Sequence, residues 1–141
     1  MRSSNAFVLL AAFAVAGTSV FARAGQTTSQ KPKIYAKDQA ARGAKQYAKL
    51  CASCHDAGKT PPAGKDKGPE LVGLTFTDSW QDRTVGELLF TIQTTMPNDG
   101  SATLTESESA DLVAHILKTN GYPDGPAPLK YDAANATVIV K

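Results

Sequence analysis

The stretch Cys51-Ala52-Ser53-Cys54-His55 decides how this chain folds and how the rest of it is interpreted. Two thiols stand three positions apart, and a histidine directly follows the second thiol. This spacing is the attachment signature of c-type haem, because the thiols can add to two vinyl groups and the histidine can offer a ring nitrogen to iron. We therefore expect one covalently bound haem c held by Cys51, Cys54 and His55.

Other uses of the two cysteines are less consistent with the sequence. They are the only cysteines of the 141-residue chain, and a disulfide across a two-residue gap closes almost no loop. A structural zinc site needs about four ligands, and outside the motif only His115 could be added. A thiol–disulfide oxidoreductase remains an alternative, although its motif would open a helix after a strand. Here the motif follows a predicted helix.

Residues 1–24 are interpreted as a secretory signal peptide. A positive start at Arg2, the apolar run at residues 6–17 and the small-x-small sequence Ala22-Arg23-Ala24 have the required order. The apolar run is short for a membrane span, although an uncleaved anchor stays an alternative. We expect a periplasmic protein with no integral membrane segment after cleavage.

Charge is balanced overall but unevenly distributed. The chain carries 15 Lys and Arg against 13 Asp and Glu, and loss of Arg2 and Arg23 would leave equal numbers. Basic residues concentrate in residues 25–68 and acidic residues in residues 69–111. This distribution is either scattered surface charge or a dipole that orients the protein toward a charged partner. Without a basic stripe interleaved with aromatic residues, nothing indicates nucleic-acid binding.

A first helix is predicted from Asp38 to about Cys51, because apolar residues recur at three- and four-residue steps. Gly43 lies inside it, where glycine costs about 1 kcal/mol relative to alanine. Such a glycine indicates that another helix crosses close by. The segment from Asp56 to about Arg83 is rich in glycine and proline and is predicted to be a loop around the cofactor.

Two capping boxes predict two further helices. Thr84-Val85-Gly86-Glu87 would start a helix that ends before Pro97. The sequence at residues 105–108, Thr-Glu-Ser-Glu, would start another that ends at the Asn-Gly pair of residues 120 and 121. This last helix is the candidate partner of the glycine-containing first helix. Residues 137–140 are predicted to be a short strand or an extended tail.

A haem iron needs a second axial ligand or an open site. Apart from the initiator, Met96 is the only methionine; it lies 41 residues after His55, at a helix end before a proline. A thioether ligand raises the reduction potential relative to two histidines and leaves no open position for oxygen or peroxide. The other candidate, His115, is predicted to lie in mid-helix and to pack at a helix crossing. We therefore expect His55 and Met96 as the metal ligands.

Taken together, the residues resemble a class I monohaem cytochrome c. The likeness rests on Gly43, Tyr47, the Cys51–His55 motif and three further stretches: Gly68-Pro69, Thr95-Met96-Pro97 and residues 112–117. Residues 80–90 and 120–125 are also similar to the cytochrome c domains of bacterial quinoprotein (PQQ) alcohol dehydrogenases. The resemblance covers roughly residues 38–125.

The resemblance implies further roles. Pro69 would present its carbonyl to the second ring nitrogen of His55, and Trp80, less clearly Arg83, would reach a haem propionate. Two positions depart from the family pattern: Asp56 replaces the usual glycine, and His115 replaces an aromatic residue opposite Gly43.

The sequence as a whole predicts a small all-α cytochrome c fold, with three to five helices wrapped around one covalently bound haem. The expected divisions are a signal peptide (1–24), a flexible lead-in (25–37), a cytochrome c domain (38–125) and a C-terminal extension (126–141). The expected function is single-electron transfer between a donor, such as a quinoprotein dehydrogenase, and a respiratory acceptor such as a terminal oxidase. The protein would not be an enzyme; a peroxidase-like activity is the alternative if Met96 is not a firm ligand.

Overall fold

The structure is a computed structural model, and it describes residues 31–56 and 66–141. This part of the chain is all-α, as predicted, and its only β pairing consists of two isolated bridges. The sequence predicts three to five helices; the structure has six helical segments, two of them only four and five residues long. The segments are α1 (Lys37–Leu50), α2 (Ala52–His55), α3 (Gly73–Trp80), α4 (Val85–Thr95), α5 (Glu106–Thr119) and α6 (Tyr131–Asn135).

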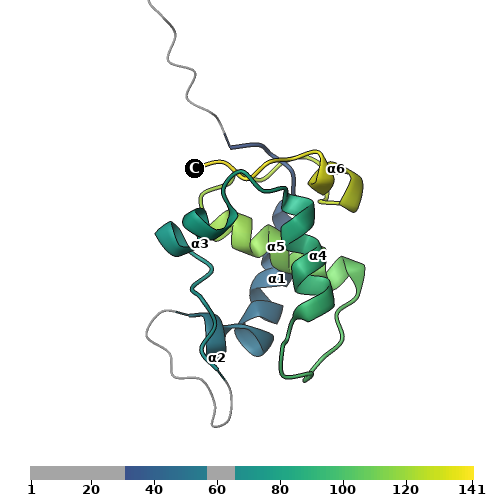
Figure 1. Cartoon of the computed structure of the whole chain (residues 1–141). Coiled ribbons are helices and arrows are strands. Elements are labelled where there is room, and N and C mark those ends of the chain that lie inside the picture. The colour runs from purple at the N-terminus through teal and green to yellow at the C-terminus, as the bar shows by residue number, and fades with distance from the viewer. Residues whose placement is uncertain (1–30, 57–65) are drawn as a thin grey trace, which may run out of the picture.

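Helices α1 and α5 cross at Gly43, which confirms the predicted close approach (Figure 1). A Cβ atom built on Gly43 would lie 1.8 Å from the backbone oxygen of Asp111 and 3.0 Å from the Cβ atom of His115. Only glycine fits this contact. The crossing is fastened at one side by Arg42, whose Nε and Nη2 atoms donate to the buried Asp111 carboxylate over 2.7 and 2.8 Å.

Both predicted capping boxes are present. The Thr84 hydroxyl accepts from the Glu87 amide over 3.1 Å at the start of α4, and Thr105 and Glu108 repeat the arrangement at α5. Helix α4 ends at Thr95 with Met96 as its C-terminal cap residue, as the following proline predicts. Helix α1, by contrast, begins after Ala36 and not at an Asp38 cap.

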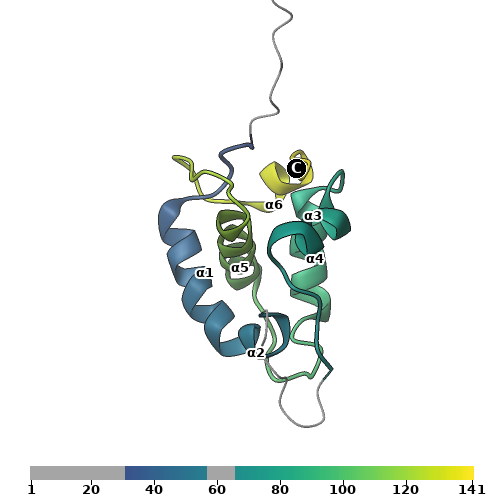
Figure 2. The same cartoon turned by 90° about the vertical axis from the view of Figure 1, so that its left-hand side faces the viewer.

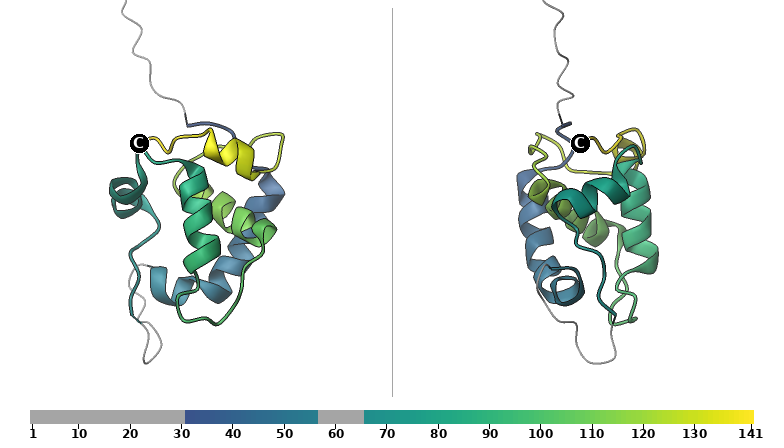
Figure 3. Two further views of the ribbon diagram at one scale, coloured as in Figure 1. Left: turned by 45° about the vertical axis from the view of Figure 1, so that its right-hand side comes forward. Right: turned by 60° about the vertical axis from the view of Figure 1, so that its left-hand side comes forward.

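Helix α3 corrects the prediction that residues 56–83 form a loop throughout. It begins at Gly73 and has no side-chain cap, and only Phe76 among its residues is buried. A helix that buries a single side chain has no apolar periodicity to indicate it. In Figure 3 it lies at the end of an extended segment that rises from the α2 end of the molecule.

The C-terminal segment, residues 126–141, packs against the helices and contributes to the core. Leu129, Ala134 and Ile139 are no more than 2% exposed. Residues 137–140, predicted as a strand or an extended tail, form one isolated bridge, between Val138 and Thr84. Figure 2 shows α6 at the end of the molecule opposite α2.

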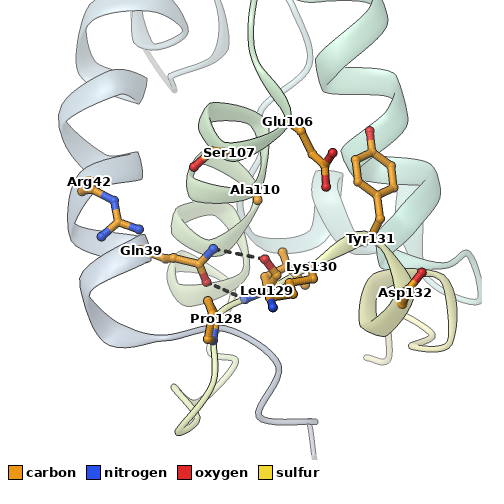
Figure 4. Close-up of a pocket in the computed structure, with 10 residues that line it drawn as sticks. All are labelled: Gln39, Arg42, Glu106, Ser107, Ala110, Pro128, Leu129, Lys130, Tyr131 and Asp132. Carbon is orange, nitrogen blue, oxygen red and sulfur yellow. Dashed lines mark hydrogen bonds between the residues drawn. The ribbon is translucent and has the colours of Figure 1, made fainter.

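A cavity of about 600 Å³ lies where this segment meets α1 and α5 (Figure 4). Gln39 lines this cavity. Its side-chain nitrogen donates to the Leu129 carbonyl over 3.2 Å, and its side-chain oxygen accepts from the Leu129 amide over 2.6 Å. The charged groups on its walls include Arg42, which is paired with Asp38 and Asp111. These bonds join the C-terminal segment to α1.

No helix in residues 31–56 and 66–141 is both long and apolar enough to cross a bilayer. The predicted signal peptide lies outside the described residues. Of the predicted lead-in, residues 31–37 are described; there Tyr35 is buried and its hydroxyl donates to the Tyr122 carbonyl over 2.5 Å.

His115 lies at the α1–α5 crossing, and we expect it to make the stability of this crossing depend on pH. Its ring stands 5.0 Å from the Tyr47 ring, and its pKa is lowered from the usual 6.5 by burial first and Lys118 second, against an opposing effect of Asp56. The unfolded chain therefore binds this proton more tightly than the folded chain. The stabilising contribution is complete above about pH 6.5 and is lost as the pH falls through the lower folded-state value.

We predict that His115→Tyr loses less stability than the wild type between about pH 7 and pH 5. The measurement is the free energy of unfolding of the holoprotein by denaturant at intervals across this range. Both proteins carry the same carboxylates, so the difference between the two curves reports on the replaced imidazole. Parallel curves would contradict the prediction.

Candidate functional site

A cavity of about 590 Å³ lies at the α2 end of the molecule, beside the Cys51–His55 motif. Its volume is within the roughly 300–1,000 Å³ of ordinary ligand and cofactor sites. Five predicted site residues line it together: Cys51, Cys54, His55, Pro69 and Met96. Its remaining walls come from the end of α1, the segment before α3, the turn after α4 and the middle of α5, with Leu50, Leu71, Ile92, Leu104, Leu112 and Ile116 as the apolar side chains.

His55 has a fixed ring orientation. Its Nδ1 atom lies 2.7 Å from the carbonyl oxygen of Pro69. Because a carbonyl only accepts, Nδ1 must carry the proton and donate it, which leaves Nε2 unprotonated in the neutral ring. A histidine whose second nitrogen donates to a carbonyl is the usual arrangement at a metal. The Nε2 atom of His55 is therefore available as a ligand for a metal.

Gly68 allows the backbone to lie directly against this ring. A Cβ atom at residue 68 would be 2.4 Å from Cε1 of His55 and 2.6 Å from its Nδ1 atom. The Gly68 amide also donates to the Cys54 carbonyl over 3.0 Å. The motif and the Gly68-Pro69 pair are thus one unit, and the imidazole, two thiols and apolar walls fit a covalently attached haem.

The thiols are free and unsuited to thiol–disulfide exchange. Cys51 and Cys54 are not joined by a disulfide. Burial, and to a smaller extent the charges of Asp56 and Cys54, raise the pKa of Cys51 to about 11. A redox-active cysteine needs a lowered pKa, because the thiolate is the attacking species. This environment argues against the oxidoreductase alternative.

Met96 is placed by the end of α4. Its amide donates to the Ile92 carbonyl over 3.1 Å, which is the last turn of the helix, and both side chains line the cavity with Cys51 and His55. His55 and Met96, which are 41 positions apart in sequence, therefore line the same cavity. The other candidate ligand, His115, does not line the cavity and contacts Tyr47 instead.

Trp80 is not among the residues that line the cavity. It lies in the last turn of α3, partly buried, and the Arg83 guanidinium stands 4.3 Å from the centre of its ring. A contact of either residue with a propionate stays a prediction. Asp56, the other departure from the family pattern, has φ −80° and ψ 143°, which any residue can adopt, so no glycine is required there.

Leu104 and Asn120 also belong to this region, although no sequence motif points to them. Leu104 is 6% exposed and lines the cavity directly before the α5 capping box. An apolar residue at this position before a cap often packs inward, and this signal could have identified it. For Asn120 the sequence predicts only the end of a helix. Its hydrogen-bond partners at residues 71 and 73 are far away in sequence, so no local pattern indicates them.

Comparison with known proteins agrees with this site. The sequence model of the family described as "Cytochrome C oxidase, cbb3-type, subunit III" matches residues 38–116, more than half of the chain. The match includes α1 except for its first residue, the Cys51–His55 motif and Met96. No curated protein and no solved structure matches the chain. The chain therefore belongs to this family of class I c-type cytochromes, electron-transfer proteins that carry covalently attached haem c.

Proposed function

We propose that this protein is an exported electron carrier whose haem iron is held by His55 and Met96. The observation that carries the proposal is the shared cavity, which collects both thiols of the motif, the oriented imidazole and the single methionine of the described residues. With two protein ligands there is no open position for oxygen or peroxide, which favours electron transfer over catalysis.

Bound haem c supplies a reversible one-electron change at iron. The protein's residues determine where that change takes place and how easily it occurs. Cys51 and Cys54 fix the group covalently, and Pro69 keeps the His55 ring in one orientation and raises its basicity. Ile92, Leu112 and Ile116 are at most 7% exposed and keep water from the cavity wall.

The proposed location is the periplasm, and it is supported by the signal-like residues 1–24. The proposed donor is a quinoprotein dehydrogenase, supported by the likeness of residues 80–90 and 120–125 to the cytochrome domains of those enzymes. The proposed acceptor is a terminal oxidase. The domain proper is proposed to be residues 38–125, and residues 126–141 follow it in sequence and pack into its core.

An absorption spectrum of the holoprotein tests the ligand set. The full chain is produced by an exporting host that has cytochrome maturation proteins. We expect a haemochrome spectrum and, in the oxidised protein, the far-red band of a methionine–iron bond. Met96→Ala should remove that band and His115→Ala, the matched control, should retain it. A wild type without the band, or a band that survives Met96→Ala, would refute Met96 as the ligand.

Lysines near the cavity are proposed to attract an acidic redox partner. Lys49 and Lys67 line the cavity. Lys59 and Lys65 follow the Cys51–His55 motif in the sequence and are outside the described residues. We predict that the triple change Lys59→Gln, Lys65→Gln and Lys67→Gln slows oxidation by ferricyanide, an anion, by roughly tenfold at low salt. Stopped-flow mixing of the reduced protein gives the bimolecular rate constant.

The control for this prediction is a lysine at the opposite end of the molecule. Lys130 is exposed beside α6, so Lys130→Gln removes a positive charge far from the cavity and should alter the rate little. High salt should abolish the difference between the triple variant and the wild type, because it screens exposed charges. Equal rates at low salt would show that these lysines do not steer the reaction.

A further inference from the structure

The segment from Gly68 to Gly73 is attached at both ends, and the two attachments come from different parts of the fold. Its first end lies against the motif: the Gly68 amide donates to the Cys54 carbonyl, and the Pro69 carbonyl accepts from His55. Its second end lies against the end of α5, where it meets Asn120.

The side chain of Asn120 makes both bonds at the second end. Its Nδ2 atom donates to the Leu71 carbonyl over 2.9 Å, and its Oδ1 atom accepts from the Gly73 amide over 2.9 Å. The same Nδ2 atom also donates to the Ile116 carbonyl over 2.8 Å. One amide group thus binds the segment on both sides of residue 72 and links it to the helix that forms the cavity wall.

These bonds are not needed to end α5. The backbone amide of Asn120 already bonds to the carbonyls of Ile116 and Leu117, and Gly121 has φ +78°, the left-handed conformation that ends a helix. Asn120 is itself held from the other side, because the Lys31 ammonium donates to its carbonyl over 2.6 Å. The side chain of Asn120 is therefore fixed in place and free to bond to residues 71 and 73.

Few side chains hold the segment otherwise. Val72 is 45% exposed and Leu74, at the start of α3, is 73% exposed. Of its side chains, only those of Pro69 and Leu71 line the cavity, and Gly73 has no side chain. The position of the Pro69 carbonyl therefore depends on the backbone bonds at the two ends of the segment.

We propose that Asn120 is a positioning residue: by holding Leu71 and Gly73 it keeps the Pro69 carbonyl against His55 and so sets the orientation and basicity of that imidazole. The inference rests on the proposed role of His55 as an iron ligand. A weaker bond from His55 to Pro69 makes the imidazole a poorer electron donor, which favours the reduced iron.

The test compares the holoproteins of Asn120→Ala and Thr119→Ala. The Thr119 hydroxyl donates only to carbonyls of its own helix, at His115 and Ile116, so its loss perturbs the same helix end without releasing the segment. Three quantities are measured: hydrogen exchange of the Gly73 amide, the NMR signals of the His55 ring in the oxidised protein, and the equilibrium constant for reduction by a one-electron mediator.

In Asn120→Ala we expect Gly73 exchange to accelerate roughly tenfold, the His55 signals to shift, and the equilibrium constant for reduction to rise about threefold. Thr119→Ala should leave all three near the wild-type values. Faster Gly73 exchange with unchanged His55 signals would overturn the proposal, and so would a variant identical to the wild type.

A second variant protects the test against misfolding of the first. Asn120→Asp keeps an acceptor for the Gly73 amide but places a carboxylate against the Leu71 carbonyl, so the His55 signals should still shift; unchanged signals would overturn the proposal. If the wild-type spectrum shows no histidine-ligated haem, the proposed ligand set is refuted, and with it the basis of this inference. A normal wild type with unmoved variants refutes the role of Asn120 alone.

Discussion

Replacing Gly43 with leucine should destabilise the holoprotein by about 3 kcal/mol or more, because α1 and α5 must separate to admit the side chain. A Cβ atom alone would stand 1.8 Å from the oxygen and 2.5 Å from the carbon of the Asp111 carbonyl. Backbone in the middle of a helix cannot move aside as a flexible side chain can. Even Gly43→Ala should lose stability, although alanine gains about 1 kcal/mol from helix propensity.

The Gly43→Leu substitution should also disturb the cavity beside the Cys51–His55 motif. Helix α1 leads directly into Cys51, and α5 supplies Leu112 and Ile116 to the opposite wall of the cavity. Separating the helices widens the cavity, so a smaller share of the exported chain should carry covalent haem. Denaturant unfolding of the holoprotein gives the free energy, and a haem stain against total protein gives the attached fraction.

The control is Ala41→Leu, which adds the same side chain to an exposed position of the same helix. Exposed substitutions of this kind change stability by about 0.5 kcal/mol or less. A Gly43→Leu protein as stable as this control would mean that the helices do not approach each other as closely as the structure has them.

The parts of the fold that the sequence predicts correctly are those whose information is local. Thr84 and Glu87, or Thr105 and Glu108, cap a helix within four residues, so the starts of α4 and α5 can be read without knowing the fold. Gly43 is a stronger case. Glycine lowers the stability of a helix wherever it stands in one, so its presence here needs an explanation. The close crossing of a second helix could be inferred from that need alone, and the structure shows it.

The presence of the motif and Met96 around one cavity was predictable for a similar reason. The Cys51–His55 motif is a chemical signature, and Met96 is the one methionine of the described residues, fixed by a helix end. The role of the Pro69 carbonyl was predicted only from the resemblance to a known family. In the structure its oxygen lies 2.7 Å from Nδ1 of His55. Asn120 could not be predicted, because its partners lie 47 and 49 residues away.

The C-terminal segment was the largest omission. Its buried residues, Leu129, Ala134 and Ile139, are five positions apart, which is neither a helical nor a strand period. Their burial depends on surfaces made by α1, α4 and α5, which no local pattern reveals. Residues 126–141 therefore looked like an addition to the domain, whereas in the structure they complete its core.

Deletion of residues 126–141 should accordingly cost several kcal/mol. Burial of Leu129 and Ile139 contributes about 1.5–3 kcal/mol for each side chain, against a total stability of about 5–15 kcal/mol for a typical domain. The deletion also leaves backbone groups without partners: the Val85 amide loses the Thr137 carbonyl at 2.8 Å, and the Asp82 amide loses the Ile139 carbonyl at 2.9 Å.

These bonds lie at the start of α4, the helix whose other end carries Met96. The truncated holoprotein should therefore lose its far-red methionine–iron band at a lower temperature than the wild type, and the band should disappear before covalent haem is affected. Absorbance during a thermal scan measures the band, and circular dichroism at the same temperatures measures the helices.

A pair of adjacent point variants separates core packing from the general effects of deletion. Ile139 is 1% exposed and Val138 is 44% exposed. Ile139→Ala should cost about 2–5 kcal/mol, whereas Val138→Ala should cost less than about 1 kcal/mol. If the two variants melt together, or if the truncated protein melts with the wild type, then residues 126–141 do not support the helix that positions Met96.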